Sequence, residues 1–160
     1  MPYGSVPVLE IDGKQLAGSG SIQRYLAEKF GLAGSNDFEN AQLDSIIGVC
    51  NDLEIELIKY FFEKDEEKRA QIKKKMEDEH LPKYLGIFER LIKTNDSAQG
   101  WAFGLNVTYA DFAIYNYFSF IQMGFDGFLD KYPHVKKNRA AVEALPNIAR
   151  WLKERPESSY

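Results

Sequence analysis

The stretch "VPVLEIDGKQLAGSGSIQRYLAEKFG", residues 6–31, decides how the first part of this chain folds. Aliphatic residues precede Asp12-Gly13, and an Asp-Gly pair between such residues is a strong signal for a two-residue hairpin turn. Residues 14–17 would then form the short returning strand. The stretch therefore predicts a β-hairpin at the start of the chain.

A helix is expected directly after this hairpin. Its apolar residues recur at the spacing of one helix face: Ile22, Tyr25, Leu26 and Phe30. Ser19 or Ser21 can cap the first turn, and Gly31 stands where a glycine commonly ends a helix. A hairpin with one helix leaves strand edges and an apolar face uncovered, so we expect something to pack there.

From residue 35 onward the helical period dominates. Asn36, with Glu39 three residues later, resembles a capping box. Two apolar stripes predict buried helix faces: Leu43, Ile46, Ile47, Cys50, Leu53, Leu57, Ile58 and Phe61, then Leu81, Tyr84, Leu85, Phe88, Leu91 and Ile92. The charged residues 63–80 between them predict a solvated helical surface with a loop, and Pro82 should start or kink the next helix.

Thr108 and Asp111 form a second capping-box pattern before the apolar run 112–121. We assign both residues to helix capping rather than to catalysis. The run is apolar nearly all round, which predicts a buried central helix. Two further helices are expected over residues 134–145 and 146–154, separated at Pro146.

Composition excludes several classes of protein. The 160 residues carry a net charge of −4 with acids and bases interleaved, which argues against nucleic acid or an anionic membrane as the main partner. No apolar run approaches the length of a membrane span, and the first residues have no signal-peptide pattern. The one cysteine, Cys50, excludes an internal disulfide framework, and no metal-ligand cluster is apparent. A cytoplasmic protein without a metal is expected, and His134 is interpreted as a helix-initiating surface residue.

Three separated motifs resemble the cytosolic glutathione S-transferases: "YGSVPVLEIDGKQLAGSGSIQRYLAEKFG", "NVTYADFAIYNYF" and "YPHVKKNRAAVEALPNIARWLKERP". The resemblance spans nearly the whole chain and is closest to the sigma class. It implies an α+β, mostly α fold. Residues 1–31 would be the C-terminal part of a thioredoxin-like domain, a hairpin plus a helix. Residues 35–160 would be the all-α C-terminal domain of a glutathione transferase.

The resemblance also assigns a glutathione site. Val6-Pro7 stands at the family's cis-proline position, which would turn the backbone of Val6 outward to pair with an extended peptide. Ser19 at the helix start would hold the γ-glutamyl carboxylate. Gly18 departs from the family, which usually has glutamine there, so one or two hydrogen bonds to the ligand would be lost.

The resemblance also implies a homodimer of the full-length protein, and it assigns two further residues to contacts with the partner subunit. Asp52 matches an aspartate that reaches across the interface to the ligand's amino group, although a solvated acid on a helix face is the alternative. Tyr3 matches an aromatic residue that inserts into the neighbouring subunit, with an exposed terminal aromatic as the alternative. The hydrophobic acceptor pocket would come partly from residues 37–62 and 80–123.

The family's catalytic tyrosine belongs to a βαβ unit that precedes the hairpin, and no residue of these 160 matches it. We therefore expect an N-terminally truncated chain, from an incomplete record or a shortened form, with no catalytic residue and little conjugating activity. Conjugation of glutathione to hydrophobic electrophiles is the function expected of the full-length parent. The alternatives are a glutathione-dependent prostaglandin-type isomerase, a non-catalytic glutathione-binding or crystallin-like protein, and a protein-interaction module that uses the hairpin edge.

Overall fold

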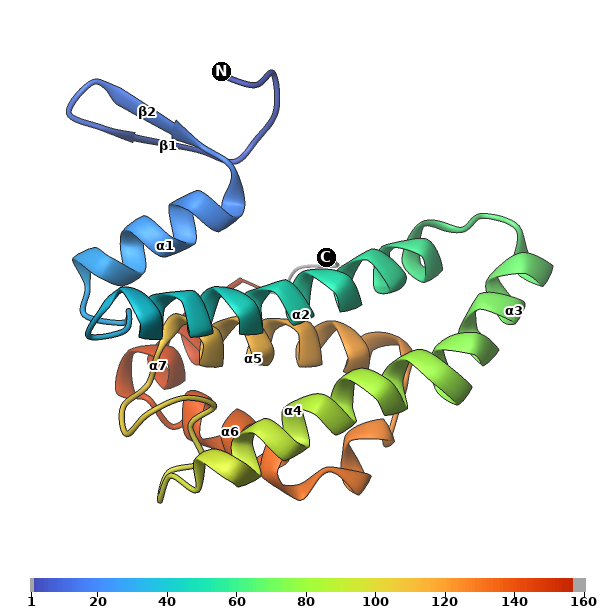
Figure 1. Cartoon of the computed structure of the whole chain (residues 1–160). Coiled ribbons are helices and arrows are strands. Elements are labelled where there is room, and N and C mark those ends of the chain that lie inside the picture. The colour runs from blue at the N-terminus through green and yellow to red at the C-terminus, as the bar shows by residue number, and fades with distance from the viewer. Residues whose placement is uncertain (1, 157–160) are drawn as a thin grey trace.

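The computed structural model describes residues 2–156 and begins with the predicted hairpin (Figure 1). Strands β1 (Val8–Ile11) and β2 (Lys14–Ala17) pair antiparallel, with Val8 opposite Ala17 and Ile11 opposite Lys14. Asp12 and Gly13 both have positive φ, 50° and 74°, as a two-residue hairpin turn requires. The Asp-Gly signal in the sequence is confirmed.

Helix α1 spans Ser19–Lys29, so Ser19 is already the first helical residue and is not the N-cap. The N-cap is Gly18, and no side chain caps the first turn, so the prediction that Ser19 or Ser21 caps the helix is wrong. Gly18 adopts φ 94° and ψ 122°, a conformation that favours glycine and turns the chain sharply from β2 into α1. At the other end Gly31 follows the C-cap with φ 69°, as predicted.

The remaining chain is helical. The elements are α2 (Asp37–Phe62), α3 (Glu66–Lys75), the π-helix η1 (Met76–His80), α4 (Leu81–Asn95), α5 (Tyr109–Gly124), the 3₁₀-helix η2 (Phe128–Lys131), α6 (Pro133–Glu143) and α7 (Pro146–Glu154). Figure 1 shows α1 above the first half of α2, with α5 beneath α2 and the hairpin standing clear of the helices. Within the described residues, no helix has both the length and the apolarity that crossing a membrane requires.

The core lies between α2, α4 and α5. Leu43, Leu53 and Phe88 are fully buried, as the two predicted stripes require. The rings of Phe88 and Phe118 meet edge to face with centroids 5.8 Å apart. The core therefore joins helices that are far apart in the sequence.

The buried central helix predicted from residues 112–121 is confirmed on one side of α5 and is wrong on the other. Ile114, Phe118 and Ile121 are buried on one side of α5, but Phe120 is 41% exposed. The helix packs its inner side on the core and leaves apolar side chains on its outer side. Ile58 and Phe61 of α2, also predicted to be buried, are likewise partly exposed.

The charged segment before α4 matches its predicted role. Helix α3 buries no residue, and in η1 only Met76 is buried. Pro82 is the second residue of α4 and directly follows the π-helix, so it lies where one kind of helix changes to the other. The helical path continues from α3 through the π-helix into α4.

Helices α2 and α5 approach closely near Gly124. A Cβ atom at Gly124 would lie 2.9 Å from the ring of Tyr60 and 3.3 Å from the ring of Phe61. Both distances are shorter than ordinary van der Waals contact. A glycine is therefore required for this packing.

Candidate functional site

The hairpin register brings Val6 and Pro7 next to Gly18 and Ser19. Because Val8 pairs with Ala17, Pro7 lies opposite Gly18, whose N–H is 3.4 Å from the Pro7 carbonyl oxygen. The Val6–Pro7 peptide bond is cis, as predicted. Residues from both ends of the hairpin therefore share one surface.

This surface exposes backbone groups of two kinds. Val6 is 78% exposed and precedes the first paired residue of β1, so its backbone can meet an extended peptide. In α1 the N–H of Ile22 bonds to the carbonyl of Gly18 at 3.0 Å, which leaves the N–H groups of the preceding turn without helical partners. Such groups and the helix dipole favour a carboxylate at Ser19.

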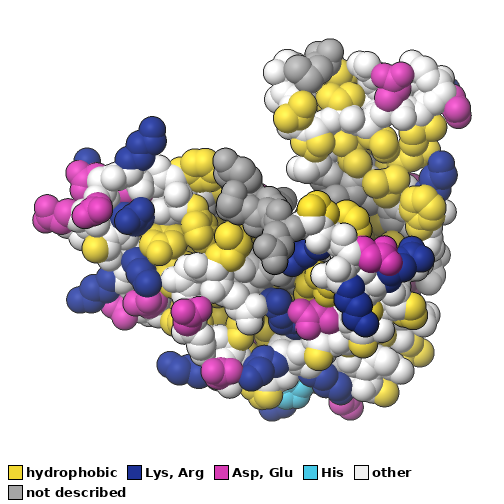
Figure 2. All heavy atoms as spheres, turned by 180° about the vertical axis from the view of Figure 1, so that it is seen from behind, with side chains coloured by type: hydrophobic (Ala, Val, Ile, Leu, Met, Phe, Trp, Pro, Cys, Tyr) yellow, Lys and Arg dark blue, Asp and Glu magenta, His cyan; other side chains and the backbone are white. Residues whose placement is uncertain are grey.

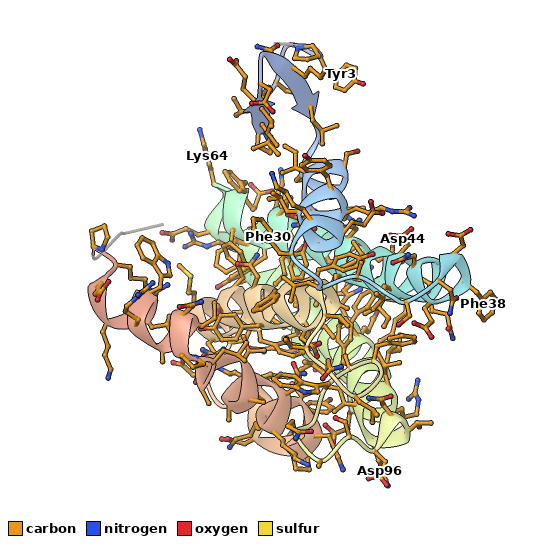
Figure 3. The ribbon with its side chains drawn as sticks, turned by 90° about the vertical axis from the view of Figure 1, so that its left-hand side faces the viewer. Tyr3, Phe30, Phe38, Asp44, Lys64 and Asp96 are labelled. Carbon is orange, nitrogen blue, oxygen red and sulfur yellow. The ribbon has the colours of Figure 1, made fainter. Side chains whose placement is uncertain are left out.

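Tyr3 and Asp52 lie apart from this surface. Tyr3 is 78% exposed and lies beyond the hairpin, at the end farthest from the helices, where Figure 3 labels it. Asp52 is exposed on α2, and among the described residues it makes no hydrogen bond or ion pair with the hairpin. Their assignment to a second subunit remains a prediction.

Helix α1 is held to the helical domain through Asp44. Arg24 of α1 donates to one oxygen of Asp44 at 2.8 Å, and the Tyr109 hydroxyl donates to the other, also at 2.8 Å. The N–H of Tyr109 bonds to the carbonyl of Leu32 at 3.0 Å. Burial, together with the hydrogen bond to Asp44, raises the pKa of Tyr109. These contacts fix the direction of α1 and hence the position of Ser19.

Asp111 connects three segments rather than capping one helix alone. Its buried carboxylate accepts from the N–H of Thr108 at 2.8 Å, which is the predicted capping contact. It also accepts from the N–H of Ala102 and the amide of Asn138, each at 2.7 Å. Burial raises its pKa, although each of these hydrogen bonds acts to lower it. No sequence motif indicated Asn138, which lies 27 positions away.

An apolar surface lies over α2 and α5, within the residues predicted to supply an acceptor pocket. It consists of Ile58, Phe61, Phe120 and Met123, all at least 37% exposed. The rings of Phe61 and Phe120 lie edge to face with centroids 6.5 Å apart. A group of exposed apolar side chains with such an aromatic contact at its centre is consistent with a binding surface.

A hollow of about 370 Å³ opens beside the hairpin, lined in part by Leu9, Ile11, Leu16 and Tyr25. Figure 2 shows hydrophobic side chains gathered on the lower part of this lobe, next to the helical domain. This is the uncovered apolar face that the sequence predicts for a hairpin with one helix.

Three titratable residues away from the hairpin and the apolar surface take part in contacts within the helical fold. The His134 N–H donates to Glu89 at 3.0 Å at the start of α6, in agreement with its predicted helix-initiating position. Burial acts to raise the pKa of Glu89, but hydrogen bonds from His134 and Val135 lower it overall. Cys50 is fully buried, as predicted, and burial raises its pKa to about 12. Across residues 2–156 no three His, Cys, Asp or Glu side chains gather as metal ligands would.

Comparisons with known proteins agree on one family. A family model described as "Glutathione S-transferase, C-terminal domain" matches residues 51–155, and one described as "Glutathione S-transferase, N-terminal domain" matches residues 1–35. "Glutathione S-transferase 1" of Ascaris suum is 36% identical over 99% of this chain and 78% of its own length.

Solved structures show the same likeness. Prostaglandin synthase D of Nilaparvata lugens is 36% identical with a TM-score of 0.89, over 98% of this chain and 77% of its own. A Nu-class glutathione transferase of Haemonchus contortus is 32% identical with a TM-score of 0.88, over 100% and 78% respectively.

Proposed function

Because this chain belongs to the glutathione S-transferase family, we propose that it binds glutathione on the surface formed by Val6, Pro7, Gly18 and Ser19. The observation that carries this proposal is the hairpin register, which places the exposed backbone of Val6 beside the N-terminus of α1. The backbone of Val6 pairs with the extended tripeptide, and the helix start with Ser19 receives its γ-glutamyl carboxylate. The reaction served is conjugation of the glutathione sulfur to hydrophobic electrophiles.

The residue at position 18 limits this site. Glycine offers no side chain to the γ-glutamyl group, so Ser19 and the backbone N–H groups must hold the carboxylate. A missing hydrogen bond to a charged group weakens binding by about 1.5–3 kcal/mol. We therefore expect modest affinity for glutathione.

The electrophile is proposed to bind on the apolar surface of Ile58, Phe61, Phe120 and Met123. Its aromatic and flexible side chains suit ligands that are hydrophobic and varied in shape. Conjugation further requires the glutathione thiol to ionise, and donors aimed at the sulfur achieve this by lowering its pKa. None of the residues assigned to glutathione binding is placed to donate to the sulfur. Binding of glutathione and conjugation must therefore be measured separately for these 160 residues.

Titration of the 160-residue protein with glutathione, followed by amide NMR, tests the proposal. Saturable shifts are expected at Val6, Val8 and residues 18–22, and Ser19→Ala should weaken binding about tenfold. Ser45→Ala is the matched control, because Ser45 is an exposed serine on α2. Equal affinity in wild type and Ser19→Ala would exclude the proposed carboxylate position. Turnover with a chloroaromatic acceptor then measures conjugation separately, and little is expected.

A glutathione-dependent isomerase is the second candidate. This candidate is supported by the likeness to the prostaglandin synthase of Nilaparvata lugens. Its sequence identity to this chain, 36%, is higher than the 32% of the Haemonchus contortus transferase. Both reactions use the same glutathione surface, so a panel of electrophiles and prostaglandin endoperoxides distinguishes them. A protein that binds glutathione but turns over neither would be a non-catalytic binding protein.

Finer assignments rest on the family resemblance. We propose a sigma-like class, a cytoplasmic location and a homodimer in which Asp52 and Tyr3 serve the neighbouring subunit. We also propose that residues 1–31 belong to the thioredoxin-like domain and residues 35–160 to the all-α domain. Sedimentation of the wild type and of Tyr3→Ala tests the dimer, since an interface residue should shift the association constant.

A further inference from the structure

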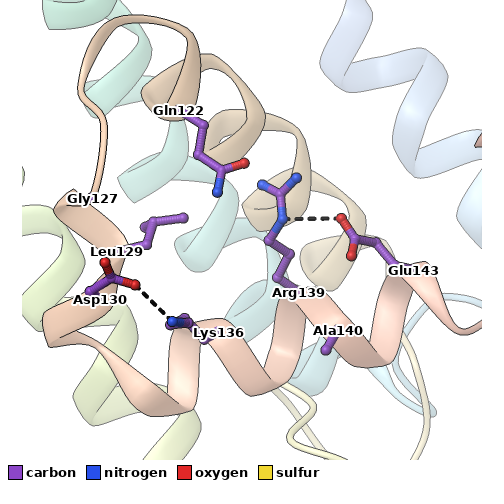
Figure 4. Close-up of a pocket in the computed structure, with 8 residues that line it drawn as sticks. All are labelled: Gln122, Gly127, Leu129, Asp130, Lys136, Arg139, Ala140 and Glu143. Atoms are coloured by element: carbon purple, nitrogen blue, oxygen red, sulfur yellow. Dashed lines mark hydrogen bonds and ion pairs between the residues drawn. The ribbon is translucent and has the colours of Figure 1, made fainter.

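A hollow of about 410 Å³ lies between the end of α5 and helix α6 (Figure 4). It shares no residue with the surface proposed for glutathione or with the apolar acceptor surface. Five of its eight lining residues carry polar or charged side chains, and Leu129 and Ala140 add apolar surface. The proposed function therefore leaves this hollow without a role.

Two ion pairs line the hollow, as the dashed lines in Figure 4 mark. Lys136 Nζ lies 2.7 Å from Asp130 Oδ1, and Arg139 Nε lies 3.1 Å from Glu143 Oε1. The lining thus carries two positive and two negative groups. A simple anion or a simple cation would meet a like charge as well as an opposite one, whereas a zwitterion can match both signs.

Arg139 is the best-positioned of these charges. Its guanidinium carbon lies 5.2 Å from the ring centroid of Tyr115, and its side chain is 19% exposed. The pair with Glu143 uses Nε, and within the described residues the buried Nη1 has no hydrogen-bond partner. Stacking on a ring fixes the guanidinium plane. Because Nη1 is closed off from solvent, a carboxylate in the hollow would meet the other terminal nitrogen, Nη2.

Gln122 supplies a neutral group beside this charge. Figure 4 shows its amide on the same side of the hollow as the Arg139 guanidinium, and it makes no hydrogen bond to another described residue. An amide NH₂ can donate to a carboxylate oxygen. Gln122 and Arg139 together therefore provide donors from two different helices.

We propose that this hollow binds a free α-amino acid with a small aliphatic side chain. The carboxylate lies between Arg139 and Gln122, and the ammonium group contacts Glu143. The carboxylate and ammonium of an α-amino acid are close neighbours, so one molecule can contact both Arg139 and Glu143, which lie side by side with Nε and Oε1 3.1 Å apart. The aliphatic side chain covers Leu129 at the base of the hollow.

Amide NMR of the 160-residue protein with three probes tests the charge requirement. L-leucine carries both charges, 4-methylpentanoate keeps only the carboxylate, and 3-methylbutylamine keeps only the ammonium group. Saturable shifts are expected around residues 122, 139 and 143 with L-leucine, at least tenfold tighter than with either single-charge probe. The absence of saturable shifts with L-leucine, or equal affinity for 4-methylpentanoate, would overturn the proposal.

Two substitutions test the contacts. Glu143→Gln keeps the side-chain shape and should weaken L-leucine binding about tenfold, while 4-methylpentanoate binds no more weakly than before. Gln122→Ala should weaken both probes, since the amide serves the carboxylate. Lys93→Gln is the control, because Lys93 lines a different hollow of about 220 Å³. Unchanged L-leucine affinity in Glu143→Gln, with its thermal transition intact, would rule out the assigned ammonium contact.

Discussion

The hydroxyl of Tyr109 donates a 2.8 Å hydrogen bond to Asp44, a residue 65 positions earlier in the chain. The same carboxylate receives Arg24 from α1, so one acidic side chain joins α1, α2 and α5. Because Ser19 is the first residue of α1, this contact determines where the proposed carboxylate position lies relative to the helical domain.

Tyr109→Phe is expected to lower the free energy of unfolding by about 1 kcal/mol, because it removes a part-buried hydrogen bond without removing the ring. Amide exchange in α1 should accelerate as well, since α1 loses part of its attachment. Tyr25→Phe is the control, because Tyr25 is a partly exposed tyrosine on α1 with no hydrogen bond to another described side chain. Equal unfolding midpoints for wild type and Tyr109→Phe would show that Asp44 does not stabilise this junction through Tyr109.

The tyrosines that contact carboxylates should respond to alkaline pH. Burial and hydrogen bonds to Asp44 and Glu54 raise the pKa values of Tyr109 and Tyr117 above the ordinary 10.0. A raised native pKa contributes stability that is complete below pH 10 and is lost as the pH rises through the native value. Absorbance at about 295 nm should therefore show more un-ionised tyrosine in the native protein than in denaturant at pH 11. In Tyr109→Phe with Tyr117→Phe, that difference should shrink.

Asp111→Ala is expected to destabilise the protein by about 3 kcal/mol or more. It leaves the buried N–H groups of Ala102 and Thr108 and the amide of Asn138 without their acceptor. Asn138→Ala should cost less, about 1–3 kcal/mol, because it removes one donor to Asp111 and one to the carbonyl of Gly100. Urea denaturation measures both. The exposed Asn116→Ala on α5 is the control, and losses no larger than its own would contradict the assigned role of Asp111.

Gly124→Ala tests the close approach of α2 and α5. Helix propensity alone would favour alanine by at most about 1 kcal/mol at this last residue of α5, but the added Cβ would lie 2.9 Å from the Tyr60 ring. Overpacking costs about 1–3 kcal/mol, so a net destabilisation is expected. Gly48→Ala is expected to stabilise the protein instead, since that helical position in α2 has no atom within 4 Å of the added methyl group. A stabilised Gly124→Ala variant would mean that the two helices separate readily.

Local features of this fold could be predicted from the sequence because they depend on neighbouring residues. The Asp12-Gly13 turn, the Asn36 cap and the start of α4 near Pro82 each follow from the backbone preferences of a few residues. The Asn36 side chain accepts from the N–H of Glu39 as predicted. The Glu39 carboxylate instead bonds one residue before the cap, at the N–H of Ser35, 2.7 Å away.

Contacts between distant elements could not be predicted. The pairing of Arg24 with Asp44 and of Asp111 with Asn138 depends on how helices rotate against one another. Apolar periodicity indicates which face is buried, but not which polar residues at its border will meet. The start of α1 differs from the sequence prediction for a related reason, because the backbone at Gly18, rather than a serine hydroxyl, begins the helix.

The conformation of Gly18 determines what a substitution at this position would cost. A Cβ atom there would meet only the Ser21 hydroxyl oxygen, 3.9 Å away, so space does not exclude a larger residue. The obstacle is the φ of 94°, which side-chain-bearing residues adopt at a cost of about 1–3 kcal/mol. A glutamine introduced by mutation would strain the junction of β2 and α1, even if its amide reached a ligand on the proposed glutathione surface. Any gain in affinity from a side chain at position 18 would therefore be offset by a loss of stability at this turn.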